Sequence, residues 1–379
     1  MVTDVRIYIL NRKGFVRRAV ICRLAAFILC TLLLVSCTPT TENGNETTLA
    51  PEITIVPETT VSFETTVTPE TTVTPETTIA PETTVTPETT TSETGEPPRE
   101  TFPITLPTHK ELPIEYTAYG KAVFLIDLST NSFAYFKGDG NQRVYPASVT
   151  KLLTALIALE YCDTDDIFVV GEERTFVMWD SSVAGLVRGD SATLYDLLHA
   201  LLLPSGGDAA YTIAANVGRV ILGNGNASAA DALNAFLDEM NVYAKKLGMT
   251  ASNFACPDGY HKDNHYSTAY DLSILAIAAY NNETIVEVTG KQKYSCPIKS
   301  GRSFTWKSSN KLIDTTSDYY YDAVNGLKTG TTDEAGCCLV ASAVINGKHY
   351  IAATFGAGST AQRFNDCLAL LLAVRDTAS

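Results

Sequence analysis

The chain has 379 residues, of which 45% are hydrophobic, so it is long enough to bury a sizeable core. Its formal net charge at pH 7 is −14, and the excess of acidic residues lies after residue 37. An acidic chain lacks the basic face that phosphate groups require, which argues against nucleic acid as a partner.

Residues 1–37 are predicted to be an export signal. Basic residues precede a short apolar run from Leu24 to Val35, which suits the core of a signal peptide and is too short to span a membrane. The run ends in Leu34-Val35-Ser36-Cys37, which resembles a bacterial lipobox. That resemblance implies cleavage before Cys37 and a lipid on its sulfur; an uncleaved signal anchor is the alternative. In both cases we expect the rest of the chain on the outer face of the cytoplasmic membrane.

Residues 38–100 are predicted to be a disordered linker. A six-residue repeat based on Pro-Glu-Thr-Thr occupies positions 57–90, and the whole segment is rich in Thr, Glu and Pro. Such a segment has too few large apolar groups to offset the entropy lost on ordering. We interpret it as a spacer, with ligand binding or glycosylated threonines as the alternatives.

Residues 101–379 are predicted to form one domain with an α+β fold. Strands are expected at 122–128 and 133–137, followed by helices at 149–160, 194–203, 208–217, 229–247 and 269–280. Two more strands, at 337–345 and 349–355, flank the hairpin signal Asn346-Gly347, and a helix at 361–374 follows. This order predicts an antiparallel sheet from both chain ends, flanked by helices, with a helical subdomain inserted between its strands.

A candidate nucleophile and base occur in Tyr-Pro-Ala-Ser-Val-Thr-Lys, residues 145–151. Ser148 precedes Lys151 by three positions, which places both side chains on one face of a helix. Lysine accepts the serine proton only if burial or a neighbouring cation lowers its pKa. The apolar residues around the 149–160 helix predict burial, and Lys328 is the candidate cation. Ser-Ser-Asn-Lys at 308–311 has the same spacing, so spacing alone does not identify the nucleophile.

A third element is Ser205 in the turn of LLLPSGGDAA. It lies along the chain between the Ser148–Lys151 pair and Lys328. Three such elements in this order resemble the serine penicillin-recognising enzymes, and most closely the D-alanyl-D-alanine carboxypeptidases, the low-molecular-mass penicillin-binding proteins with a β-lactamase-like fold. The resemblance covers nearly all of residues 115–379. It rests on four stretches, YPASVTKLLTALIALE, SSVAGLVRGDSATLYDLLHALLLPSGGDAA, LGMTASNFACPDGYHKDNHYSTAYDL and VNGLKTGTTDEAGCCLVAS. The 308–311 stretch falls after the second-serine element, and Lys-Ser-Gly at 299–301 has no hairpin directly after it, so neither fits the order.

The resemblance implies cleavage between two D-alanines at the end of a peptidoglycan stem peptide. Ser148 attacks the carbonyl, Lys151 takes the proton, and Ser205 relays a proton to the departing D-alanine. The main-chain N–H groups of Ser148 and Thr331 bind the oxyanion. Lys328 and Thr329 hold the terminal carboxylate with help from Arg363, and Gly330 and Thr331 complete the substrate-binding residues. β-Lactam antibiotics are expected to acylate Ser148 and to leave slowly.

No cofactor or metal is expected. His261 and His265 are four residues apart but lack a third ligand, and both lie in a stretch that the family shares without metal. Six cysteines follow the linker, and the sequence leaves open whether they form disulfides or stay free.

One position departs from the family pattern. Gly207 stands where the family usually has an asparagine that binds the substrate amide, so we expect an altered rate or preference, with Asp208 or a water molecule as the candidate substitute. A DD-endopeptidase and a β-lactamase of the same fold remain alternatives, although the Glu-x-x-Leu-Asn stretch of the common β-lactamases is absent from the sequence. The non-enzymatic alternative is a tethered module that binds the cell wall or senses penicillin.

Overall fold

The computed structural model describes residues 103–377. The predicted export signal with Cys37 and the predicted linker at 38–100 lie outside these residues. Within 103–377, none of the helices combines the length and the apolar character needed to cross a membrane.

A six-stranded sheet combines strands from both ends of the described chain, in the order β1-β3-β2-β12-β11-β10. β1 runs parallel to β3, and every other neighbouring pair is antiparallel. Ile126 of β2 lies opposite Ile351 of β12, which joins the two ends of the domain and confirms the expected origin of the sheet. The strands are β1 (Thr108–His109), β2 (Ala122–Asp127), β3 (Ser132–Lys137), β10 (Val324–Thr332), β11 (Gly336–Ile345) and β12 (Lys348–Ala357).

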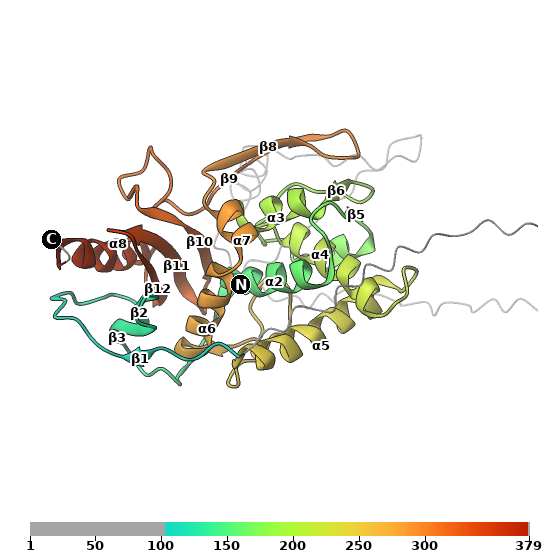
Figure 1. Ribbon diagram of the computed structural model, residues 1–379. Coiled ribbons are helices and arrows are strands. Elements are labelled where there is room, and N and C mark those ends of the chain that lie inside the picture. The colour runs from blue at the N-terminus through green and yellow to red at the C-terminus, as the bar shows by residue number, and fades with distance from the viewer. Residues whose placement is uncertain (1–102, 378–379) are drawn as a thin grey trace, which may run out of the picture. The chain divides into compact units, whose positions relative to one another are not determined.

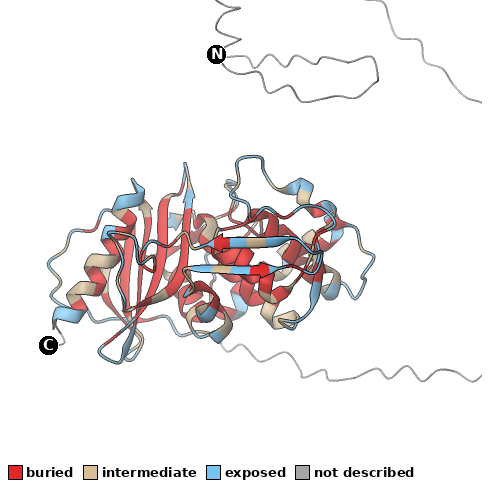
Figure 2. Cartoon of the chain, turned by 90° about the horizontal axis from the view of Figure 1, so that it is seen from above, coloured by how far each residue is buried: buried red, intermediate tan, exposed pale blue. Residues whose placement is uncertain are grey.

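The two faces of this sheet enter separate cores. Along β2, Val123 and Leu125 pack in the core that includes α8 (Thr360–Thr377), whereas Phe124 and Ile126 join the core of the inserted helices. This alternation follows from the two-residue period of a strand. Figure 1 shows α8 on one side of the strands and the other helices on the opposite side, and Figure 2 shows that the strands between them are largely buried.

Helix α2 (Lys151–Tyr161) lies at the centre of the inserted helices, and its residues 151–158 are all buried, as the apolar residues on every side of it predicted. The surrounding helices are α3 (Leu194–Leu202), α4 (Gly207–Ile221), α5 (Ala229–Leu247), α6 (Ala269–Tyr280) and α7 (Glu283–Thr289), with two short 3₁₀ helices, η1 (Ala147–Thr150) and η2 (Glu172–Phe176). Thr193, Ser228 and Thr268 cap α3, α5 and α6 by accepting a main-chain N–H with their side chains.

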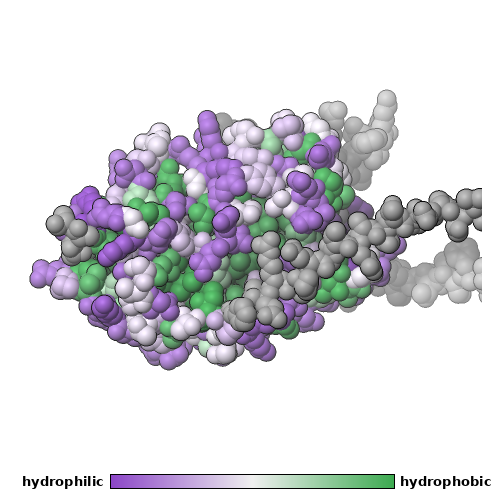
Figure 3. Space-filling view, viewed as in Figure 1, coloured by the Kyte–Doolittle hydropathy of each residue, from purple (hydrophilic) through white to green (hydrophobic). Residues whose placement is uncertain are grey.

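Three two-stranded pairs complete the domain: β4 (Arg143–Val144) with β7 (Ser267–Thr268), β5 (Ile167–Val169) with β6 (Ser191–Thr193), and β8 (Lys293–Pro297) with β9 (Ser303–Lys307). The β4–β7 pair brings the segment before Ser148 beside the end of the connection between α5 and β7, which is called the 247–266 segment below. Helix α7 and the β8–β9 hairpin were not among the predicted elements. On the face drawn in Figure 3, hydrophobic residues form patches between hydrophilic side chains.

Candidate active site

Ser148 lies in the 3₁₀ helix η1, and Lys151 is the first residue of α2. The sequence predicted one α-helical face for both residues, so the boundary differs from the prediction. In a 3₁₀ helix, residues i and i+3 are eclipsed, which brings these two side chains closer together than an α-helical turn would. Ala147, immediately before the serine, has a φ of 47°, an uncommon backbone conformation for a residue with a Cβ.

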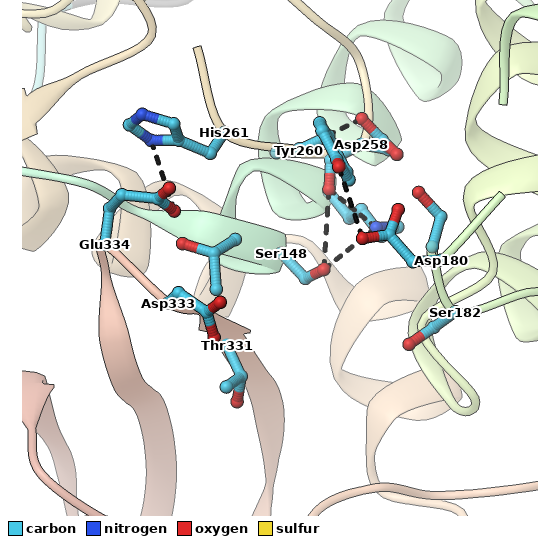
Figure 4. Close-up of a pocket in the computed structure, with 13 residues that line it drawn as sticks. Ser148, Asp180, Ser182, Asp258, Tyr260, His261, Thr331, Asp333 and Glu334 are labelled. Carbon is cyan, nitrogen blue, oxygen red and sulfur yellow. Dashed lines mark hydrogen bonds and ion pairs between the residues drawn. The ribbon is translucent and has the colours of Figure 1, made fainter. Parts of the chain in front are cut away.

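Lys151 and Ser148 are in hydrogen-bonding contact. The Lys151 Nζ donates to Ser148 Oγ at 3.0 Å and to the main-chain oxygen of Asp258 at 2.6 Å. Figure 4 shows Ser148 between the end of β10, which carries Thr331, and the loop that carries Asp180 and Ser182. The serine hydroxyl therefore faces both its base and an open space.

The environment of Lys151 favours the neutral amine. The side chain is 2% exposed, and burial is the largest cause of its lowered pKa, opposed by the negative charge of Asp258. Burial and a neighbouring cation, Lys328, were the two predicted causes of a lowered pKa at Lys151. The structure confirms burial as the largest cause, and proximity to Lys151 helps to lower the pKa of Lys328.

β10 contacts η1 at Gly330. A Cβ added to Gly330 would lie 3.0 Å from Ser148 N, 3.0 Å from Ala147 Cβ and 3.1 Å from Pro146 O. Glycine at this position lets the strand backbone approach the serine turn closely. Thr331 is the next residue of the strand and lines the same cavity as Ser148.

The other β10 candidates lie deeper. Lys328 is fully buried, its Nζ donates to Thr329 O at 2.9 Å, and burial lowers its pKa well below the usual value. The Thr329 hydroxyl is 2.6 Å from the hydroxyl of Ser309. Ser309 belongs to the second Ser-x-x-Lys stretch, which therefore contacts β10 through a serine and lacks the Ser148–Lys151 arrangement.

Arg363 near the start of α8 reaches the same strand. Its Nη1 donates to Gly330 O at 3.0 Å and to Thr331 Oγ1 at 2.8 Å, and its Nε is buried without a hydrogen-bond partner. The structure thus brings Arg363 beside the last residues of β10. A guanidinium at this position can orient Thr331 and add positive charge near a bound carboxylate.

Ser205 lies in a buried turn and is not among the residues that line the cavity. It is 7% exposed with a φ of 66°, in the turn before α4. Among residues 103–377, no hydrogen bond joins Ser205 to Ser148 or to Lys151, and the cavity described below does not include it. Its relay role remains a prediction.

Asp208 does not substitute for the missing asparagine side chain at 207. Its carboxylate accepts the main-chain N–H groups of Ala184, Gly185 and Leu186 at 2.7–2.8 Å. Both oxygens are therefore committed to holding the 184–186 loop against α4.

A cavity of about 380 Å³ opens over Ser148 and Lys151. Its wall includes several residues to which the sequence analysis gave no role, namely Asp180, Ser182, Asp258, Tyr260, Asp333 and Glu334. The hydroxyl of Tyr260 donates to Asp180 Oδ2 at 3.3 Å, and both residues line the cavity. The Pro-Asp-Gly turn at 257–259 was the available signal for part of this wall.

The two histidines weighed as metal ligands have different environments. His265 is buried between the hydroxyl of Thr150 at 2.9 Å and the N–H of Ala255 at 3.0 Å, and burial lowers its pKa to about 4. His261 lies at the cavity, 3.7 Å from a Glu334 oxygen. All six cysteines that follow the linker are free thiols in the structure.

A model of the D-alanyl-D-alanine carboxypeptidase family matches residues 108–359. The chain is 31% identical over 246 residues to D-alanyl-D-alanine carboxypeptidase DacF of Bacillus subtilis, a match that covers 64% of this chain and 59% of the relative. It is 30% identical over 257 residues to a D-alanyl-D-alanine carboxypeptidase of Streptomyces sp. strain K15, covering 65% of this chain and 84% of the relative.

Among solved structures, the Streptomyces K15 DD-transpeptidase superposes with a TM-score of 0.61 at 29% identity, covering 68% of this chain and 97% of that chain. This likeness confirms the β-lactamase-like fold that the sequence predicted. Since the family model spans well over half of the sequence, the chain belongs to the D-alanyl-D-alanine carboxypeptidase family.

Proposed function

We propose that this protein is a serine-type D-alanyl-D-alanine carboxypeptidase that removes the terminal D-alanine from peptidoglycan stem peptides. One observation carries the proposal: a buried lysine, Lys151, donates to Ser148 Oγ at 3.0 Å beside an open cavity. A lysine with a lowered pKa is a competent base for a serine nucleophile.

The reaction has two steps. In the first, Ser148 Oγ forms a bond to the carbonyl carbon while its proton passes to the neutral Lys151. The bond to the terminal D-alanine nitrogen then breaks, and that nitrogen leaves with a proton delivered through Ser205. In the second step, water adds to the ester carbonyl and gives a proton to Lys151, the bond to Ser148 Oγ breaks, and the proton passes to the serine as the shortened peptide leaves with a new carboxyl group. The main-chain N–H groups of Ser148 and Thr331 stabilise the oxyanion in both steps.

The terminal carboxylate of the substrate binds at the end of β10. Arg363 supplies positive charge, while the Lys328 amine and the hydroxyls of Thr329 and Thr331 supply donors. Support comes from the contact of Arg363 with Thr331 at 2.8 Å. β-Lactams enter the same site, and their leaving nitrogen stays tethered after ring opening, so the acyl-enzyme on Ser148 persists.

The test combines intact-mass spectrometry with product analysis. The protein is mixed with benzylpenicillin and followed over time, and release of D-alanine from a peptide ending in D-Ala-D-Ala is measured separately. A lasting adduct on Ser148 with D-alanine release supports the proposal, and Ser148→Ala removes both signals. Free protein beside hydrolysed penicillin indicates a β-lactamase. Intact penicillin with no adduct indicates a wall-binding module.

A second acceptor is supported by the solved relative, whose name is DD-transpeptidase. An acyl-enzyme on Ser148 transfers to an amine as readily in chemical terms as to water, and a cross-linked stem peptide is cleaved by the same residues. Two experiments measure how the activity divides between hydrolysis, transfer to an amine and cleavage of cross-links. In one a D-amino acid is added as acceptor, and in the other a cross-linked dimer is the substrate.

The proposal also covers location. Cys37 carries the lipid that holds the chain on the outer face of the cytoplasmic membrane, and residues 38–100 act as a spacer between the lipid and the catalytic domain. The sequence of the apolar run and the composition of the linker support this arrangement. Cell fractionation tests it, since Cys37→Ala is expected to lose lipid labelling and membrane retention.

A further inference from the structure

The turn that contains Asp258 meets the first residue of α4 beside the catalytic lysine. A Cβ added to Gly207 would lie 3.1 Å from Asp258 Oδ2 and 3.3 Å from Ser182 O. Asp258 is 2% exposed, so its carboxylate is enclosed at this position. The space that a larger side chain at 207 would enter is therefore occupied by a carboxylate from a different segment.

Asp258 also contacts the reacting groups through its backbone. Its main-chain oxygen accepts from Lys151 Nζ at 2.6 Å and lies 3.4 Å from Ser148 Oγ. Its Oδ1 accepts the main-chain N–H of Tyr260 at 3.1 Å, which fixes the turn. Asp258 thus orients the Lys151 amine through its main-chain carbonyl and also places a carboxylate near that amine.

The charges around Lys151 come from several elements. Titratable groups with an electrostatic influence on Lys151, or influenced by it, are Asp258, Cys256 and His265 on the 247–266 segment, Asp208 on α4 and Lys328 on β10. Burial raises the pKa of Cys256 to about 12 and lowers that of His265 to about 4, so both are neutral near pH 7. Asp208 is held by three main-chain N–H groups. Asp258 is therefore the leading anionic partner of the lysine.

We propose that Asp258 is a positioning residue for Lys151 and that Gly207 is required to leave room for its carboxylate. The inference rests on the proposed function, because it assumes that Lys151 is the base for Ser148. Gly207 and Asp258 are 51 positions apart in the sequence, so this arrangement depends on the fold and not on a local motif.

The test measures the pH dependence of acylation by benzylpenicillin in the full-length protein. Asp258→Asn keeps the oxygen that accepts from Tyr260 and removes the charge. Without that charge the protonated form of Lys151 is less stable and its pKa falls, so the lysine stays a neutral base to lower pH. The acid limb of the pH profile of acylation is therefore expected to shift to lower pH by about one unit. Asp318→Asn makes the same change in net charge on an exposed loop and is expected to leave the limb in place. An Asp258→Asn limb that superimposes on that of the parent overturns the proposal.

A second pair of variants tests the shared space independently. Gly207→Asn alone places its side chain against the Asp258 carboxylate, and acylation is expected to fall at least tenfold. In Gly207→Asn with Asp258→Ala, the space is free again, and a several-fold recovery is expected. Equal rates in the single and double variants contradict the shared-space argument. A parent protein that is never acylated, at any pH, overturns the proposed function itself and is thereby distinguished from either result.

Discussion

Gly330→Ala should slow acylation of Ser148 far more than it destabilises the domain. The added methyl group would lie 3.0 Å from both Ser148 N and Ala147 Cβ, and 3.1 Å from Pro146 O. All three atoms belong to the serine turn, so relief requires β10 and that turn to separate by a few tenths of an ångström. The separation would displace the two N–H groups assigned to the oxyanion relative to each other.

The magnitudes follow from these contacts. Overpacking by one methyl group costs about 1–3 kcal/mol of unfolding free energy. Complete loss of one oxyanion donor costs about 100- to 1,000-fold in rate, so a partial displacement is expected to cost about 10- to 100-fold. The assay is the second-order rate of benzylpenicillin acylation by mass spectrometry, with thermal unfolding measured on the same samples.

A matched control is available within the chain. A Cβ added to Gly225 has no other atom within 4 Å, so Gly225→Ala introduces the same chemical change without a contact. It is expected to match the parent in both measurements. If Gly330→Ala acylates at the parent rate, the close approach of β10 to Ser148 has no role in the reaction and the reasoning is refuted.

Three further predictions concern the base, acid stability and the thiols. Lys151→Ala is expected to lower acylation by about 10²- to 10⁴-fold, and Lys151→Arg should not restore it, because a guanidinium stays protonated; recovery with arginine would show that charge alone suffices. Burial lowers the pKa of His265 and of His199 to about 4 from 6.5. The unfolded chain then binds more protons between pH 6.5 and 4, so stability falls as pH decreases through this range, by about 3 kcal/mol for each fully buried histidine. His265→Gln should reduce this loss in urea unfolding at pH 7 and pH 4, and an unchanged loss would contradict the assignment. Finally, residues 101–379 unfolded without reductant should titrate six thiols, since all six are free; a count of four or fewer would indicate a disulfide.

Much of the fold could be predicted because its elements carry strong local signals. The Asn346-Gly347 turn lies between β11 and β12 as expected, and both of its residues have the positive φ that such a turn needs. The all-round apolar character of 149–160 correctly predicted a buried helix. The 3₁₀ geometry of Ser148 was missed because a spacing of three residues suits both helix types.

The rest of the site depends on contacts between distant segments. Asp258 lies 107 residues after Lys151, and its main-chain oxygen makes the shorter of the two hydrogen bonds of the lysine. A carbonyl oxygen has no sequence signature, because every residue has one. Likewise, the commitment of Asp208 to the 184–186 loop follows from the path of that loop, which no local pattern specifies.

The two buried lysines explain why the site needs elements from so many segments. Removing an ammonium group from water costs several kcal/mol unless it is paired or neutral. Lys151 is accommodated as a neutral amine that donates to Ser148 and to Asp258 O. Lys328 is fully buried close to two other basic groups, Lys151 and Arg363, and its Nζ donates to Thr329 O. Under the proposed function, a substrate carboxylate at the end of β10 would meet these basic groups, so a peptide that ends in a free carboxylate is expected to bind more tightly than the corresponding amide.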